Sequence, residues 1–319
     1  MFRSVDVLRK RVVVTGATGF LGGHVLNQLQ RSNATVIAVA DRRRSKQDRE
    51  HPATSVETIW FDRSEELAES VKSAKPDYVV HLHAAVTTNR SLAAVRSTLE
   101  TNLLPSLELM SACLEMHLER LILIGSGEEF GSVTGPLDDN TVLSPASPYG
   151  ASKAAISAYA KMFHRAFQLP VVVLRPSVVY GPLQSPHMLI PQVLHALHEK
   201  REIAVTEGRQ TRDFIHVEDV ARGIVCALVA NGIDGRCLNL ASGKVVTVRD
   251  CLAIIERITG CEGLIRYGAL PYRVGEIFSY EPIAEATFSA LKWRPDISLE
   301  EGLTETWKSV RDTPSLPSS

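Results

Sequence analysis

Short apolar runs recur along the first 240 residues, and segments with helical periodicity lie between them. The runs lack the polar alternation of a half-exposed strand, which predicts strands buried on both faces. They are Arg11–Thr15, Thr35–Ala40, Glu57–Phe61, Asp77–Ala85, Leu121–Gly125, Pro170–Leu174 and Cys237–Leu240. Strands that alternate with helices in this way predict an α/β fold, with a parallel sheet covered by helices on both faces.

Several segments beside these strands predict helices. A helical pattern follows the first strand over His24–Arg31, and Ser91–Leu118 is helical with an interruption near Pro105. Pro–Tyr–Gly after a serine is typical of a helix start and predicts a helix over Pro148–Phe167. The stretch Arg212–Val220 predicts the start of a further helix.

The pattern changes after Pro176, where prolines become frequent and the predicted strands shorten. This change suggests an added lobe, whereas Cys237–Leu240 is expected to rejoin the main sheet. The predicted parts are a main domain (8–175 with about 214–241), a smaller C-terminal lobe (176–213 with 242–312) and a disordered tail (313–319).

Composition narrows the possible partners. The net charge of −1 creates no field that would attract nucleic acid or an anionic membrane. No apolar run approaches the roughly 18 residues of a membrane span, and no signal-peptide core precedes the first strand. The five cysteines show no metal-ligand spacing, and His81 and His83 alternate along one strand without a third ligand. We therefore expect a cytoplasmic protein without a metal site and without nucleic-acid or membrane partners.

A glycine-rich turn joins the first strand to the helix that follows it. Gly16, Gly19 and Gly22 form a GxxGxxG pattern in the order strand, turn, helix. Gly16 permits a tight turn, Gly19 lets the backbone approach a pyrophosphate, and Gly22 lets the helix pack against the strand. The free N–H groups at such a helix N-terminus favour phosphate binding. The motif therefore predicts a dinucleotide cofactor.

Two opposite signals for the choice of cofactor follow the second strand. Asp41 stands where an acidic residue accepts hydrogen bonds from ribose hydroxyls, which favours NAD. Arg42 and Arg43 could instead pair with a 2′-phosphate, which favours NADP. We therefore expect NAD(P)(H), with a slight preference for NADPH. Asp62, after the third strand, could accept a hydrogen bond from the adenine amino group.

The candidate chemistry centres on Tyr149 and Lys153, which lie one helical turn apart on one face. An ammonium beside a phenol favours the phenolate, so Tyr149 is expected to exchange a proton near neutral pH. Ser126 follows a buried strand, and its hydroxyl could hold a substrate oxygen against the phenol. A lone YxxxK pattern usually marks an ordinary surface helix, but the other motifs of this chain favour a catalytic role.

Together these motifs resemble the extended short-chain dehydrogenase/reductase family of NAD(P)-dependent nucleotide-sugar epimerases, dehydratases and reductases. The resemblance covers nearly the whole chain. It rests on TGATGFLG at 15–22, VVHLHAA at 79–85, Ser126, YGASK at 149–153, RPSVVYGP at 175–182, RDFIHVEDVA at 212–221 and RVGE at 273–276. It implies a Rossmann-type doubly wound sheet with a smaller C-terminal lobe that binds a nucleotide sugar.

The resemblance also assigns roles to single residues. Tyr149 would be the proton donor and acceptor, Lys153 would tune its pKa and hold the nicotinamide ribose, and Ser126 would bind the reacting sugar oxygen. The implied cofactor site further contains Gly16, Thr18, Gly19, Phe20, Leu21, Gly22, Asp41, Arg42, Arg43, Asp62, Leu82, His83, Ala84, Asn102 and Pro176. The implied substrate site further contains Thr87, Val178, Arg212, Arg273 and Glu276, of which the arginines would clamp a diphosphate. The helices at 91–118 and 149–167 match those through which relatives pair as homodimers.

The run after Ser126 bears on the reaction. In 4,6-dehydratases the hydroxyl residue is typically followed by an acid–base pair, whereas here Gly127 replaces the acid and Glu128 occupies the base position. The segment GSGEEFG resembles that of 4-keto-6-deoxyhexose reductases. The leading hypothesis is therefore an NDP-4-keto-6-deoxyhexose 4-ketoreductase with Tyr149 as proton donor. The alternatives are an NDP-sugar 4-epimerase or 4,6-dehydratase with tightly bound NAD, and a non-enzymatic nucleotide-sensing regulator.

Overall fold

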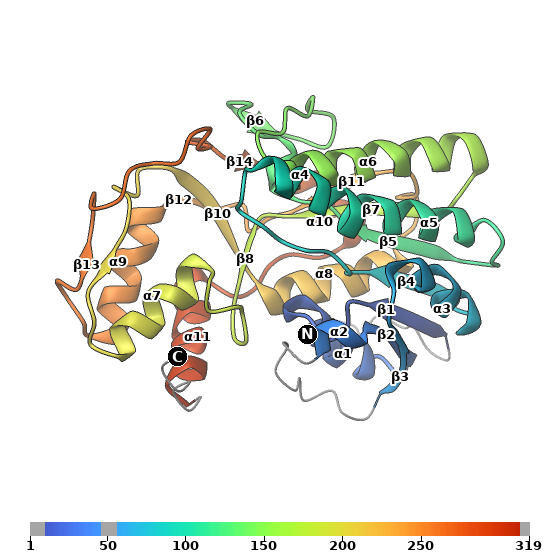
Figure 1. The fold of residues 1–319 in the computed structure, drawn as a ribbon, viewed down its shortest axis with the longest axis horizontal. Helices are drawn as coiled ribbons and strands as arrows, with labels where there is room; N and C mark the ends of the chain where they lie inside the picture. The colour runs from blue at the N-terminus through green and yellow to red at the C-terminus, as the bar shows by residue number, and fades with distance from the viewer. Residues whose placement is uncertain (1–9, 46–55, 313–319) are drawn as a thin grey trace.

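A seven-stranded parallel sheet forms the centre of the protein. The computed structural model describes residues 10–45 and 56–312, and Figure 1 shows their arrangement. The order β11-β7-β5-β4-β1-β2-β3, with every neighbouring pair parallel, confirms the predicted doubly wound α/β fold. The strands are β1 (Arg11–Thr15), β2 (Thr35–Asp41), β3 (Glu57–Phe61), β4 (Tyr78–His81), β5 (Arg120–Ile124), β7 (Val171–Pro176) and β11 (Cys237–Leu240).

Each face of this sheet has its own apolar core, because successive residues of a strand point to opposite faces. Val12 and Val14 of β1 belong to one core and Val13 to the other, and all three are fully buried. Figure 1 shows α6 and α8 on opposite sides of the sheet. One face is covered by α1 (Phe20–Gln30), α8 (Val217–Val229) and α10 (Glu285–Leu291), and the other by α3 (Leu67–Ser73), α5 (Leu104–Cys113) and α6 (Pro148–Phe167).

The C-terminal lobe, on the left in Figure 1, has a separate core. Its three-stranded sheet has the order β12-β10-β8, and its helices enclose buried side chains such as Leu194, Leu252 and Leu303. The elements are β8 (Val178–Tyr180), α7 (Leu189–His198), β9 (Ile203–Ala204), β10 (Thr211–His216), β12 (Val245–Thr247), α9 (Val248–Thr259), β13 (Ile265–Arg266) and α11 (Leu299–Asp312). A small parallel pair joins β6 (Pro136–Leu137) to β14 (Glu281–Pro282) and lies at the top in Figure 1.

The remaining short elements lie in the connections between the strands and the longer helices. They are α2 (Arg42–Ser45), the single turn η1 (Ser64–Glu66), α4 (Leu92–Thr98), the π-helical turn η2 (Leu99–Leu103) and the 3₁₀ turn η3 (Gly127–Glu129). The interruption expected near Pro105 is in fact η2, and Pro105 lies in the first turn of α5, where a missing N–H costs little.

Two further sequence expectations were wrong in detail. The first helix begins at Phe20 and not at His24, because Gly22 and Gly23 pack as part of its first turns. The stretch predicted as a helix start is the strand β10 up to His216, and α8 begins at Val217. By contrast, β11 pairs with β7 and so rejoins the main sheet as expected.

The domain boundaries, including the one at 175, stay a prediction. Positions 8, 9 and 313–319 lie outside the described residues, so the expected disordered tail falls there. Among the helices of the described residues, none combines the length and apolarity needed to cross a membrane.

Candidate active site

The glycine turn after β1 forms a cradle that side chains would fill. Gly16 has φ +65°, and a Cβ there would lie 2.7 Å from the backbone nitrogen of His83. A Cβ on Gly22 would overlap the carbonyl of Gly16. Helix α1 begins after Gly19 with no side-chain cap and no acidic residue in its first turn. These exposed N–H groups fit the pyrophosphate of a dinucleotide, and Thr18, Phe20 and Leu21 stand at the same turn, half-buried.

At the end of β2 a buried carboxylate faces two arginines. Asp41 is buried, and Arg43 donates hydrogen bonds to both of its oxygens, at 3.0 and 2.8 Å. Burial alone would raise the pKa of Asp41, but the hydrogen bonds from Arg43 outweigh it and hold the pKa below its usual value. Arg42 pairs with Asp62 at 3.3 Å and lies over the ring of Trp60. Both arginine side chains therefore have partners.

A directional chain of hydrogen bonds runs beneath the cradle. Ser106 Oγ donates to the carbonyl of Asn102 (2.7 Å), so the 3.1 Å contact with His81 requires a donor on His81 Nε2. His81 Nδ1 then accepts from Thr15 Oγ1 (2.8 Å), which itself accepts from the backbone N–H of His83. Burial lowers the pKa of His81 far below its ordinary value, so the ring stays neutral. His81 is thus a structural link and not a metal ligand.

Asn102 joins this chain to the helix that carries Tyr149. It lies in the π-helical turn η2, a geometry that often marks functional sites. Its amide accepts from Ala85 N at 2.7 Å and donates to Ala85 O at 3.1 Å and to Ser152 Oγ at 3.4 Å. Ser152 in turn donates to the carbonyl of Tyr149. These hydrogen bonds therefore fix the positions of the segment after β4, of η2 and of α6 relative to one another.

The structure brings Ser126, Tyr149 and Lys153 together as the spacing predicted. Ser126 follows β5, and its hydroxyl accepts from the backbone N–H of Glu128 at 3.1 Å and lies near enough to the buried Tyr149 phenol to affect its pKa. The Lys153 ammonium donates to the carbonyl of Ile124 at 2.7 Å and lies 5.9 Å from the Tyr149 ring centroid. All three groups therefore line one corner at the carboxyl end of β5.

The electrostatics of this corner differ from the expectation. Burial, followed by the charge of Glu128, raises the pKa of Tyr149 above its ordinary value, and the hydrogen bond with Ser126 only opposes this. Lys153 does not lower the pKa of Tyr149 in the protein alone, because its ammonium is turned to Ile124. Burial lowers the pKa of Lys153 to about 8, against the opposing charge of Glu129.

Glu128, whose role the sequence left open, holds the start of α6. Its carboxylate accepts a hydrogen bond from Ser147 Oγ at 2.6 Å, and Ser147 caps α6 by accepting from Gly150 N at 3.0 Å. The backbone of Gly150 runs so close to the Glu128 carbonyl that a Cβ would lie 2.5 Å from it. Glu128 therefore fixes the helix turn that carries Tyr149.

The sequence reasoning missed two buried carboxylates. Glu129 is fully buried below Ser126, where it pairs with Arg175. Asp213 is fully buried in β10 and accepts hydrogen bonds from the backbone N–H groups of Ser242, Gly243 and Lys244. Both residues lie in segments that carry the resemblance, GSGEEFG and RDFIHVEDVA, but neither segment indicated a role for them.

The C-terminal lobe contains the two arginines predicted to bind substrate, and they differ in burial and in their hydrogen-bond partners. Arg212 is largely buried, pairs with Glu276 at 2.6 Å and donates to the carbonyl of Ile277. Arg273 is exposed, and its side chain makes no hydrogen bond or ion pair with any residue that the structure describes. Arg90, from the loop after β4, donates to the carbonyls of Val274 and Gly275 at 2.7 and 2.8 Å.

The remaining predicted residues are placed along the same cleft. Leu82, Ala84 and Pro176 lie at strand ends of the main sheet, and Thr87 Oγ1 accepts from Asn89 N in a turn. Val178 pairs with Phe214 in the lobe sheet and is half-buried. Gly127, where dehydratases carry an acid, leaves room for Tyr280, since any Cβ there would overlap the Tyr280 hydroxyl.

The described part of the chain contains no cluster of three His, Cys, Asp or Glu side chains arranged to hold a metal ion. His83, the second histidine of its strand, instead packs edge-on against Phe61 with ring centroids 5.6 Å apart. The site thus assembles hydroxyls, one buried ammonium, carboxylates and a glycine turn whose geometry would suit a phosphate.

Comparisons with known proteins place this site in a family. Residues 12–241 match the NAD dependent epimerase/dehydratase family. A putative UDP-glucose 4-epimerase of Methanocaldococcus jannaschii is 28% identical over 92% of this chain and 95% of its own length, and a dTDP-glucose 4,6-dehydratase of Actinoplanes is 29% identical over 93% and 96%. The UDP-glucose 4-epimerase of Thermus thermophilus, solved with NAD, superposes with a TM-score of 0.86 at 26% identity, covering 95% of this chain and 99% of that one. The chain belongs to the NAD dependent epimerase/dehydratase family.

Proposed function

We propose that the protein is an NAD-dependent nucleotide-sugar 4-epimerase. The observation that carries this proposal is the corner at Ser126. Its hydroxyl lies beside the Tyr149 phenol, which suits proton transfer at a sugar hydroxyl, whereas the place of the dehydratase acid next to it is filled by Tyr280. The epimerases among the relatives support the same reaction.

The surroundings of Asp41 favour NAD over the NADPH preferred from the sequence. A 2′-phosphate would lie against a buried carboxylate whose ionised form is already stabilised by Arg43. Arg42 and Arg43 would have to abandon Asp62 and Asp41 to bind that phosphate. Ribose hydroxyls need no such exchange, because Asp41 can accept from them directly. The NAD bound to the Thermus relative agrees with this choice.

The chain's own residues then have separate tasks. NAD, when bound, would accept a hydride from C4 of the sugar and return it to the opposite face. Tyr149 would take the C4 hydroxyl proton as the phenolate and later return it, while Ser126 holds the same oxygen. Because burial raises the pKa of Tyr149 in the protein alone, the Lys153 ammonium would have to turn from Ile124 toward the phenol, where its charge would favour the phenolate. Arg212 and Arg273 would hold the substrate diphosphate from the lobe side.

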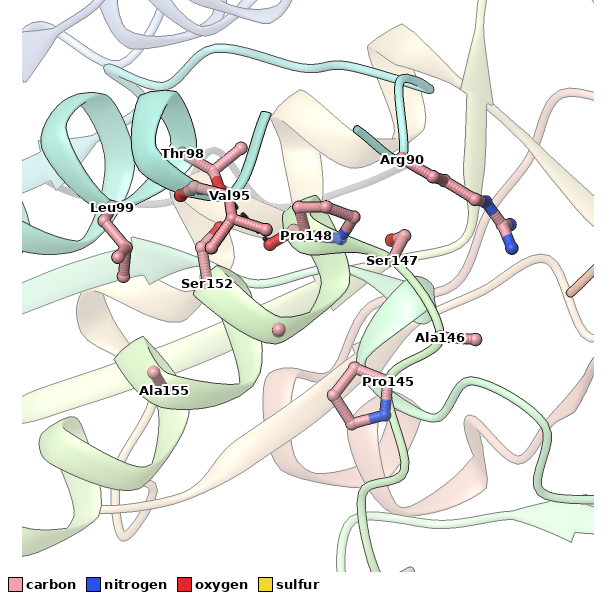
Figure 2. A pocket seen from close by; sticks show the side chains of 11 residues that line it. Arg90, Val95, Thr98, Leu99, Pro145, Ala146, Ser147, Pro148, Ser152 and Ala155 are labelled. Carbon is pink, nitrogen blue, oxygen red and sulfur yellow. Dashed lines mark hydrogen bonds between the residues drawn. The ribbon is translucent and has the colours of Figure 1, made fainter. Parts of the chain in front are cut away.

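We also propose that the enzyme is a homodimer through α4 and α6. Leu92 and Val95 of α4 and Leu99 at the start of η2 lie at helical spacing and are exposed, Leu92 by 89%. Figure 2 shows the adjoining pocket of about 420 Å³ between α4 and the start of α6. A second copy on a twofold axis would cover both apolar features. Sedimentation velocity should give a dimer for the wild type and a monomer for Leu99→Glu.

A second candidate, the 4-ketoreductase, is favoured by the segment Gly125–Gly131 and its resemblance to reductases. In a reductase the dinucleotide must leave after each turnover, whereas in an epimerase it can stay bound. Retention of the cofactor therefore distinguishes the two candidates.

The test starts from the purified protein without added cofactor. We expect released NAD to be identified by mass after denaturation, and UDP-glucose or dTDP-glucose to give the C4 epimer by NMR. A 4-keto-6-deoxy product would instead identify a dehydratase. An empty protein that consumes NADPH only with an NDP-4-keto-6-deoxyhexose would identify the reductase, and either result overturns the epimerase proposal.

A further inference from the structure

A single buried carboxylate touches three of the elements that build the catalytic corner. Glu129 Oε1 accepts from the backbone N–H of Ser126 at 2.8 Å. Its Oε2 accepts from Ser157 Oγ on α6 at 2.7 Å and from Arg175 Nε on β7 at 2.8 Å. Glu129 is fully buried and Arg175 is 1% exposed, so water does not share these contacts.

Ser157 connects this network to the face of α6 that carries the candidate catalytic residues. Tyr149, Lys153 and Ser157 are spaced four residues apart and therefore lie on one face of α6. The Glu129 carboxylate thus ties the Ser126 backbone to the same helix face that carries the phenol and the ammonium. The approach is tight, because a Cβ on Gly125 would overlap Glu129 Oε1.

Stability alone is a weak reason for such a pair. A buried ion pair loses the hydration of both charges, and an apolar pair of similar volume is often as stable. Here one arginine nitrogen, Arg175 Nη1, is buried without a hydrogen-bond partner among the described residues, so the pair is not even fully satisfied. The carboxylate instead accepts a hydrogen bond from Ser126 with one oxygen and from Ser157 of α6 with the other.

We propose that Glu129, paired with Arg175, is a positioning residue that fixes Ser126 against the Tyr149–Lys153 face of α6. This inference rests on the proposed function for its catalytic consequence. Its charge also opposes the lowering of the Lys153 pKa by burial, so the same residue helps to keep that ammonium protonated. The other titratable groups near Lys153 are Tyr149 on its own helix and the neutral His81 on β4.

The main test replaces the charged pair by an apolar one, Glu129→Val with Arg175→Leu. We expect a melting temperature near that of the wild type but a kcat on UDP-glucose about 100-fold lower, because misplacement of a catalytic group by about 1 Å has this effect. KM should change less than about threefold. A double variant with wild-type kcat overturns the proposal.

Two further variants keep the test decisive if the double variant does not fold. Ser157→Ala leaves the ion pair intact and removes only the link to α6, so kcat should fall about three- to tenfold at unchanged melting temperature. Asp234→Asn is the control, because it breaks the Arg120 pair at the opposite end of β5 and should leave kcat unchanged. Wild-type kcat in Ser157→Ala overturns the proposal.

A readout without substrate separates this proposal from the function. Hydrogen exchange of segments 126–130 and 147–157 should accelerate in Ser157→Ala and not in Asp234→Asn. If the wild type acts on no nucleotide sugar, the proposed function fails while the exchange result still decides the positioning role. Unchanged exchange in Ser157→Ala contradicts the role of Glu129.

Discussion

The main sheet and the C-terminal lobe hold their candidate site residues by different kinds of contact. On the sheet side, Ser126 and Lys153 stand at a strand end and on a 20-residue helix, and their supports Glu129 and His81 are buried. On the lobe side, Arg273 and its neighbours lie on an exposed loop that is held mainly through backbone carbonyls. The sheet side is rigid because packing and buried hydrogen bonds coincide there, whereas the lobe loop can move at little cost.

The difference suggests a division of labour. Chemistry requires reacting atoms to be fixed within fractions of an ångström, which only the packed side provides. Binding of a flexible diphosphate, which the proposed function assigns to the loop, would tolerate adjustment. Changes on the sheet side should therefore lower kcat, and changes on the lobe side should raise KM.

The largest effect is expected for Tyr149→Phe. Removal of the phenolic oxygen eliminates the proton donor and should lower kcat by about 10²- to 10⁴-fold. The ring still fills its buried site, so the melting temperature and bound NAD should be unchanged. Steady-state kinetics with UDP-glucose measure this, and near-normal turnover would show that another group transfers the proton.

A smaller effect on the same side is expected for Gly16→Ala. The left-handed φ and the clash with the His83 backbone together cost about 1–3 kcal/mol. If the turn shifts to relieve this strain and must be restored when NAD binds, the affinity for NAD should fall by about 5- to 150-fold. Gly232→Ala is the matched control, because Gly232 has φ +71° but open space around it. Calorimetric titration with NAD should show a loss of affinity in Gly16→Ala and none in Gly232→Ala. Equal losses of affinity in both variants would mean that backbone strain, and not the clash with His83, weakens NAD binding.

The sequence predicted the features of the site that depend on local spacing but not those that depend on long-range contacts. The order of strands, the glycine turn and the Tyr149–Lys153 spacing depend on local periodicity, so they were predictable. The role of Glu129 was not, because its segment GSGEEFG gives no sign of its partners Ser157 and Arg175, which are 28 and 46 residues away. The direction of the Tyr149 pKa also needed the structure, since burial outweighs sequence proximity to Lys153.

On the lobe side the sequence supplied the residues but not their contacts. Arg212 and Glu276 were both assigned to the substrate, yet they pair with each other at 2.6 Å. Arg90 was not singled out at all, although it joins the loop after β4 to the Arg273 loop. Such long-range contacts follow from the packing of two separate cores, which periodicity along one chain does not encode.

A modest effect is therefore expected for Arg90→Ala. Loss of its two hydrogen bonds to the Val274 and Gly275 carbonyls loosens the loop and should raise KM about three- to tenfold, with kcat within about twofold. Arg96→Ala is the control, since Arg96 pairs only with Glu100 on the exposed surface of α4. A fall in kcat without a change in KM would contradict the division between the two sides.

The smallest effect concerns the pH dependence that Lys153 confers. Because burial lowers its pKa to about 8, turnover that needs the ammonium should decline above that pH, and Lys153→Arg should remove this decline because arginine stays charged. The contribution to stability has the opposite sign. Between about 8 and the unfolded value of about 10.4 the unfolded chain binds more protons, so this residue's contribution to the free energy of unfolding rises with pH. Turnover and the difference in melting temperature from Lys153→Met should therefore move in opposite directions as pH rises, and parallel movement would show that another group titrates.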